Sequence, residues 1–139
     1  MGKIVAIDYG TKRTGIAETD SLQLIASGLT TVSTYELKEF MVNYLNKEDI
    51  DCLVIGEPKD LQNQASEVEK SIIPFINFIK KRFKSLEIVR VDERFTSKMA
   101  FQSMLDGGLK KKQRQDKGII DKVSATLILQ SYLESKSSL

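Results

Sequence analysis

Three acidic residues lie where predicted elements end or begin, and their positions suit a metal site. Asp8 ends an apolar run at residues 4–7, and Glu93 follows an apolar run at residues 88–91. Asp121 lies in the first turns of the last predicted helix. If that helix crosses the sheet near the strand ends, the three carboxylates converge. Carboxylates held close together repel each other, and a divalent cation offsets the repulsion. Oxygen ligands of this kind suit Mg2+ or Mn2+.

The absence of histidine narrows the chemistry further. The sequence contains no histidine, which excludes Ser-His-Asp catalysis, Cys-His catalysis and histidine-ligated zinc. A general base must then be Asp, Glu, Lys, Tyr or a metal-bound hydroxide. One or two divalent ions held by carboxylates can activate water and hold a phosphodiester for in-line attack. A phosphodiester is therefore the substrate class that the residue types favour.

Each acid also has a simpler explanation. Glu93 and Arg94 could form a surface ion pair, which contributes at most about 1 kcal/mol. Asp121 could be an ordinary acid in the first turn of a helix, stabilised by the helix dipole. From residue types alone, these explanations stay open beside the metal site.

A polar turn follows Asp8 and supplies candidate substrate contacts. Gly10 and Gly15 bracket this turn, which contains Lys12 and Arg13. The two cations could neutralise charge on a phosphate. The turn could also be a nucleotide-phosphate loop of the kind found in actin-like ATPases. Those enzymes need two lobes and a second phosphate loop, and a chain of 139 residues fits neither requirement.

The positive charge of the chain is concentrated in one predicted loop. The net charge is +2, but residues 110–117 (KKKQRQDK) alone carry +4, so the rest of the chain carries −2. Such runs are usually only solvated, but beside a phosphodiester site this one becomes a candidate nucleic-acid contact, through Lys110, Lys111, Lys112 and Arg114. Each phosphate contact adds salt-dependent affinity. Because no aromatic residue interrupts the run, we expect it to bind the backbone rather than stack on bases.

The elements that must position these residues alternate between strands and helices. Apolar runs predict strands at residues 4–7, 16–17, 29–32, 52–55 and 88–91. Helical periods, with capping boxes starting at Ser33 and Ser66, predict helices at 34–47, about 66–84, about 96–106 and about 118–135. The length of the chain fits one domain, residues 1–139, with a mixed α/β sheet flanked by helices.

The remaining composition indicates a reducing compartment. The single cysteine, Cys52, lies in an apolar run and is expected to be a small buried hydrophobe. No signal-peptide pattern opens the chain, and no apolar run reaches the length needed to span a membrane. We therefore expect a cytoplasmic protein without a membrane partner.

Four segments together resemble the YqgF/RuvX family. They are IDYGTKRTGIA, CLVIGEP, VDERFTSKMA and IIDKVSATLILQSYL, and they cover nearly the whole chain in the order and spacing of that family. Its members are related to Holliday junction resolvases and are described as nucleases of the 16S rRNA precursor. The resemblance implies an RNase H-like fold with a five-stranded mixed sheet whose first three strands are antiparallel.

The resemblance also implies roles for residues. It implies that Asp8, Glu93 and Asp121 are the catalytic acids and hold Mg2+ or Mn2+. Arg94, which matches the segment after the second acid, is a candidate substrate contact that could neutralise developing charge, as Lys12 or Arg13 could. This chain has Glu57 where many relatives carry an apolar residue. Glu57 is therefore a secondary candidate for a metal ligand, and a solvated loop acid is the equal alternative.

The function implied is a metal-dependent nuclease that processes the 5′ end of pre-16S rRNA during ribosome biogenesis. Its expected partners are structured precursor rRNA and the pre-ribosomal particle, and the chain would act as a monomer or a homodimer. Two alternatives stay open: a resolvase of branched DNA that uses the same site, and a non-catalytic nucleic-acid-binding module. The choice of RNA over DNA rests on the resemblance alone.

Overall fold

A computed structural model describes residues 2–59, 66–92 and 117–137. Predictions that fall on other residues, including the helix at about 96–106 and the basic loop, lie outside this part of the chain. The elements in order are β1 (Lys3–Asp8), β2 (Arg13–Thr19), β3 (Ala26–Ser33), the 3-10 turn η1 (Thr34–Glu36), α1 (Leu37–Lys47), β4 (Ile50–Glu57), α2 (Glu69–Arg82), β5 (Glu87–Asp92) and α5 (Lys117–Ser137). None of the helices described is long and apolar enough to cross a membrane.

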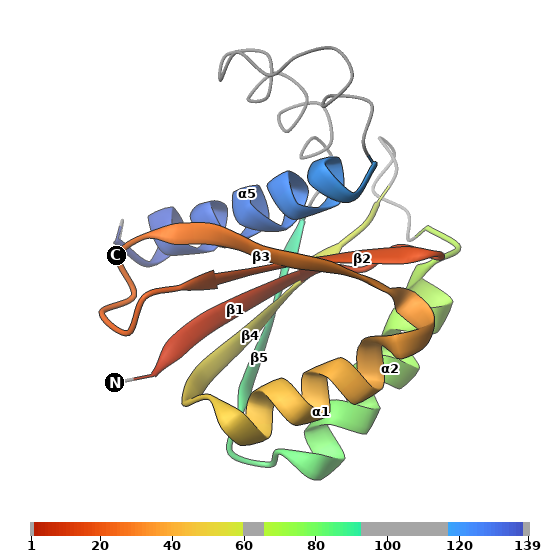
Figure 1. Cartoon of the computed structure of the whole chain (residues 1–139), viewed down its shortest axis with the longest axis horizontal. Coiled ribbons are helices and arrows are strands. Elements are labelled where there is room, and N and C mark those ends of the chain that lie inside the picture. The colour runs from red at the N-terminus through yellow and green to blue at the C-terminus, as the bar shows by residue number, and fades with distance from the viewer. Residues whose placement is uncertain (1, 60–65, 93–116, 138–139) are drawn as a thin grey trace.

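The five strands form one mixed sheet in the order β3-β2-β1-β4-β5 (Figure 1). The first three strands pair antiparallel, and β4 pairs parallel with both β1 and β5. This arrangement confirms the predicted fold class. Because β1, β4 and β5 run in the same direction, their carboxyl ends meet at one edge of the sheet, which we call the site edge.

The side chains of the sheet alternate between two apolar layers. Ile4 and Ala6 of β1 pack against α5, whereas Val5 and Ile7 pack into the layer that contains α1 and α2. Figure 1 shows α5 on one side of the sheet and the other two helices on the opposite side. The same alternation, continued by one residue, places Asp8 on the α5 face.

Two helices begin later than the sequence predicts. The predicted capping boxes do not form: Ser33 makes no side-chain cap, and α2 begins only at Glu69. Before α1, the chain is bound instead to the turn after β1. The Thr34 backbone N–H donates to the Lys12 carbonyl at 3.0 Å, and the Thr34 hydroxyl donates to the Gly10 carbonyl at 2.7 Å. These two bonds tie the start of η1 to the turn after β1.

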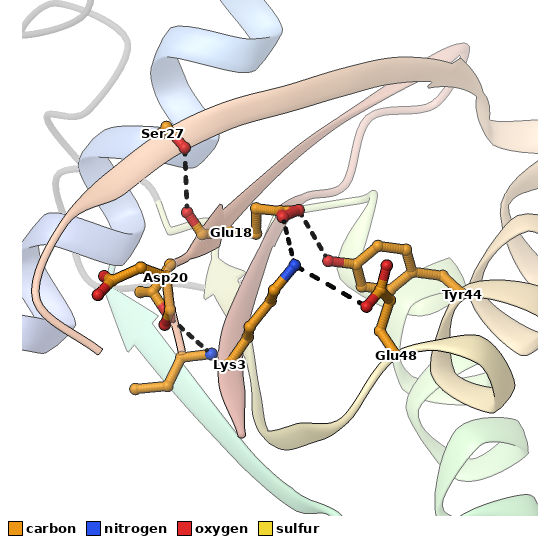
Figure 2. Close-up of polar contacts among 8 residues, drawn as sticks. Lys3, Glu18, Asp20, Ser27, Tyr44 and Glu48 are labelled. Atoms are coloured by element: carbon orange, nitrogen blue, oxygen red, sulfur yellow. Dashed lines mark hydrogen bonds and ion pairs between the residues drawn. The ribbon is translucent and has the colours of Figure 1, made fainter. Parts of the chain in front are cut away.

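The edge opposite the site is held by polar contacts (Figure 2). Glu18 accepts hydrogen bonds from the Lys3 ammonium at 3.1 Å and from the Tyr44 hydroxyl at 2.9 Å, which ties β2 to β1 and α1. Burial, together with this contact to Glu18, raises the pKa of Tyr44 above its ordinary value. In the loop after β2, Asp20 accepts from three backbone N–H groups at residues 22, 24 and 25, which lowers its pKa.

The prediction that Cys52 is a buried hydrophobe is confirmed. The residue is 3% exposed in the layer between the sheet and α5, and its thiol contacts the Tyr132 hydroxyl at 3.8 Å. Desolvation raises the pKa of the thiol to about 11. At neutral pH the thiol is therefore protonated and a poor nucleophile.

Arg90 of β5 joins the site edge to the start of α2. Its guanidinium forms two bonds to the Glu69 carboxylate, at 2.8 and 2.7 Å, and donates to the carbonyls of Ile55 and Gly56 near the end of β4. Both charged side chains are mostly buried, with 21% and 14% exposed. One arginine thus holds the end of β4 and the first residue of α2 together.

We predict that Arg90→Met lowers the free energy of unfolding by about 2 kcal/mol, because it leaves the Glu69 carboxylate and two carbonyls without their donor. The exposed Lys81→Met on α2 is the control, and we expect a change within about 0.5 kcal/mol. Urea unfolding of both variants measures the difference. Equal midpoints for Arg90→Met and the parent would show that the contact does not stabilise this edge.

Candidate active site

Asp8 stands at the end of β1 between two glycines. It pairs with Gly15 of β2 across the antiparallel ladder. On its other side, Ile7 pairs with Ile55 of β4, and the same register one residue further brings Gly56 beside Asp8. Because glycine has no side chain, neither neighbouring strand fills the space next to the carboxylate on the α5 face.

The same Gly15 is the point where α5 rests on the sheet. A Cβ atom built on Gly15 would collide with the Asp121 carbonyl oxygen and lie 3.0 Å from the Lys122 nitrogen. The helix backbone therefore touches the strand backbone directly. Since Gly15 is the pairing partner of Asp8, this contact brings the start of α5, with Asp121, to the end of β1.

Asp121 is held by an ion pair with Arg13. The Arg13 Nε donates to the Asp121 Oδ2 at 3.1 Å, and the two side chains are 41% and 22% exposed. The structure thus places an acid predicted as a metal ligand next to a cation predicted as a substrate contact. The Nε of Arg13 is used on the carboxylate, and a guanidinium carries four further N–H donors that can meet a phosphate oxygen.

The turn between β1 and β2 is fixed from the other side of the sheet. The hydroxyls of Thr14 and Thr34 lie 2.8 Å apart, and Thr34 also binds the carbonyl of Gly10. A Cβ atom on Gly10 would collide with the Arg13 carbonyl oxygen, so the turn is too tight for any other residue. Lys12 is exposed at its tip. The cations of the turn are therefore held on a well-defined backbone.

Glu57 lies on the other face of the sheet from Asp8. In β4, Cys52 and Val54 face α5, so the alternation directs Glu57 toward the layer with α1 and α2. Its carboxylate forms an ion pair with Lys59 at 3.2 Å. The structure does not bring Glu57 together with Asp8 and Asp121, which weighs against a role as a fourth ligand.

The other predicted site residues lie outside the part of the chain that the structure describes. They are Glu93, Arg94, Lys110, Lys111, Lys112 and Arg114. Asp92, which precedes Glu93 in the sequence, ends β5 at the site edge and pairs with Glu57. Among residues 2–59, 66–92 and 117–137, no three acidic, histidine or cysteine residues are grouped as a metal site would need. Two of the three predicted ligands belong to these ranges.

Sequence reasoning did not identify the roles of Gly15, Gly56 and Tyr9. A glycine in a strand is a signal for a close backbone approach, and Gly15 shows such an approach to the backbone of α5. Tyr9 continues from Asp8 on the other face, where its ring lies 5.9 Å from that of Phe75. Burial raises the pKa of the Tyr9 hydroxyl above its ordinary value, so this tyrosine is protonated at neutral pH.

We predict that Gly15→Ala lowers the free energy of unfolding by about 2 kcal/mol or more, because the helix backbone must shift to make room for a methyl group. Gly28→Ala is a matched control under the same helix. There the nearest atoms are side-chain atoms of Lys122 and Thr126 at 3.4 and 3.5 Å, so we expect a change within about 0.5 kcal/mol. Thermal unfolding of both variants tests this, and equal losses would contradict the close contact at Gly15.

Comparison with known proteins adds to this geometry. Residues 2–135 match the model of a family described as "RuvX: Holliday junction resolvase". The chain is 55% identical to a protein of Phocaeicola vulgatus over 98% of both chains, and 58% identical to a protein of Bacteroides thetaiotaomicron over 98% of this chain and 99% of the relative. Both relatives are named "Putative pre-16S rRNA nuclease".

Solved structures agree on the fold. The chain resembles Thermus thermophilus RuvC in complex with a Holliday junction substrate, with a TM-score of 0.58 and 13% identity over 99% of this chain and 96% of that one. A second structure of the same RuvC gives a TM-score of 0.57 at 14% identity. At this identity the likeness shows the fold alone, and it confirms the RNase H-like class predicted from the sequence.

Proposed function

Because the chain belongs to the RuvX family of Holliday junction resolvase-like proteins, we propose that it is a nuclease whose active site is built around Asp8 and Asp121, and that its substrate is precursor 16S rRNA. The observation that carries this proposal is the contact at Gly15, which brings the two acids to one point of the sheet. Relatives that match along nearly their whole length and carry the name of a pre-16S rRNA nuclease support the substrate.

The donor set fits a divalent cation. Asp8 and Asp121 offer carboxylate oxygens, and the glycines beside Asp8 leave space on the α5 face. Hard oxygen donors of this kind suit Mg2+ or Mn2+. In our proposal Asp8, Asp121 and Glu93 hold the metal, and Glu93 enters because it directly follows β5, which ends at the same edge. A bound cation would supply an activated water and positive charge for a phosphodiester.

The protein's own residues orient the substrate in this proposal. Arg13 holds Asp121 in place through its Nε and presents its remaining N–H groups to a phosphate oxygen. Lys12 adds a second positive charge from the exposed tip of the turn. Arg94 and the cations Lys110, Lys111, Lys112 and Arg114 extend the contact along the RNA backbone. We place this activity in the cytoplasm, on the pre-ribosomal particle.

We predict that Asp8→Asn lowers the rate of cleavage of a precursor 16S rRNA fragment in Mg2+ on the order of 100-fold or more, the scale reached when a charge-stabilising group is removed from an active site. Asp49→Asn is the matched control, since Asp49 is exposed and precedes β4 at the opposite edge, roughly 17 Å away along a six-residue strand. We expect it to cut like the parent. Equal rates for Asp8→Asn and the parent would show that the site is elsewhere.

Branched DNA is the second candidate substrate, because the family model is described as that of a Holliday junction resolvase. We predict that, at one salt concentration and one Mn2+ concentration, the protein cleaves precursor rRNA at least about tenfold faster than a four-way DNA junction, a difference in barrier of about 1.4 kcal/mol. Faster cleavage of the junction by a symmetric dimer would favour the resolvase. RNA binding in EDTA without cleavage in any divalent metal would favour a non-catalytic binding module.

A further inference from the structure

The layer opposite α5 carries a second concentration of positive charge. Residues 70–86 contain five basic residues and no acidic one. Four of them gather at the end of α2 and just beyond it, and all four are exposed: Lys80, Lys81, Arg82 and Lys84. Together with Lys38 of α1, we call them the α2 basic surface. This surface and α5 lie on opposite sides of the sheet.

Two of these cations come from different helices and meet on one aromatic ring. The Lys38 ammonium lies 5.0 Å from the centre of the Phe78 ring, and the Arg82 guanidinium lies 5.5 Å from it. The negative potential of a ring face attracts each cation, but the cations repel each other. The helix dipole explains basic residues at the end of α2, yet it does not explain why α1 adds one more.

Within the described residues, the α2 basic surface is not neutralised by acids. None of its five cations forms an ion pair there, in contrast to other basic residues that do: Lys3, Arg13, Lys59, Lys70 and Arg90. A hollow of about 440 Å3 adjoins the surface, with Arg82 and Lys84 in its wall together with one acid, Asp51. The Asp51 carboxylate accepts hydrogen bonds from the Gly2 N–H and the Gln23 amide rather than from these cations. Cations without acidic partners beside a hollow suit the phosphate backbone of a nucleic acid.

The fold connects this surface to the proposed active site. Arg90 ties Glu69, the first residue of α2, to the carbonyls of Ile55 and Gly56 at the site edge. From there α2 runs for 14 residues, about 21 Å, to the cations at its end. A single strand needs several nucleotides to cover a length of this order. Lys38 lies nearer the start of the helix, in the wall of a hollow that it shares with Ser71 and Pro74.

We infer that the α2 basic surface binds the phosphate backbone of the RNA substrate several nucleotides away from the cut. This inference rests on the proposed nuclease function. It adds a second binding surface, for a part of the RNA that the active site does not contact. A concave, cationic surface joined by one helix to the site edge fits a strand that continues past that edge. A flat layer of anionic lipid headgroups would make less use of the hollow.

The test uses Lys81→Gln/Lys84→Gln in an Asp8→Asn background, so that RNA is not cut during the measurement. Binding is measured without divalent metal to precursor rRNA fragments that extend about four or about twelve nucleotides from the cut, lengths that fall short of and pass the expected contact. The matched control is Lys70→Gln/Lys136→Gln, which removes the same charge from two other exposed helical positions.

We expect the Asp8→Asn protein to bind the longer RNA more tightly than the shorter one, and Lys81→Gln/Lys84→Gln to remove this advantage. Two lost phosphate contacts should weaken binding of the longer RNA on the order of tenfold at 0.1 M salt and reduce the slope of log K against log salt by about 1.5. The control should keep the advantage.

Equal binding of the longer RNA by the double variant and the control would overturn the inference. A double variant that loses binding to phosphatidylglycerol vesicles but keeps the advantage of the longer RNA would also overturn it, in favour of a membrane surface. The readout is separate from that of the proposed function: Asp8→Asn reports on cleavage, whereas these measurements report on binding by a protein that does not cut.

Discussion

The approach of α5 to β2 at Gly15 is the constraint on which the rest of the site depends. Two backbones touch there, and a single methyl group would push them apart. Because Gly15 also pairs with Asp8, one contact decides both the packing of the last helix and the distance between two acids that lie 113 positions apart in the sequence. Packing and chemistry therefore share one residue, and selection for either would preserve the glycine.

Much of the fold could be predicted because its signals are local. Short apolar runs gave the strands, and the run ending at Gly56 has the continuous burial expected of a strand covered on both faces. The buried Cys52 follows from the same run. The helix starts could not be predicted in the same way. Thr34 is bound by the turn after β1, a contact between residues 24 positions apart that no local capping pattern contains.

The site was predictable as a set of residue types but not as a geometry. Asp8 and Asp121 stand at element ends, where a pattern can identify them. The partner of Asp121 is Arg13, which the sequence suggested only as a contact for substrate, because an ion pair across 108 positions leaves no trace in spacing. Strand alternation decides on which face of the sheet Glu57 lies, but only the structure shows that Cys52 and Val54 of the same strand face α5.

Charge is distributed by the fold as well as by the sequence. The basic run at residues 110–117 can be recognised directly in the sequence. The α2 basic surface cannot, because Lys38 of α1 and Arg82 of α2 come together only in the folded structure, at the ring of Phe78. Arg90 then has two consequences at once. By binding Glu69 and the carbonyls at the end of β4, it holds the start of α2 at the site edge, and the 14 residues of the helix lead away from that edge. The fold therefore sets the distance between the site edge and the cations at the end of α2. A surface that binds the substrate at a defined distance from the cut needs such a constraint.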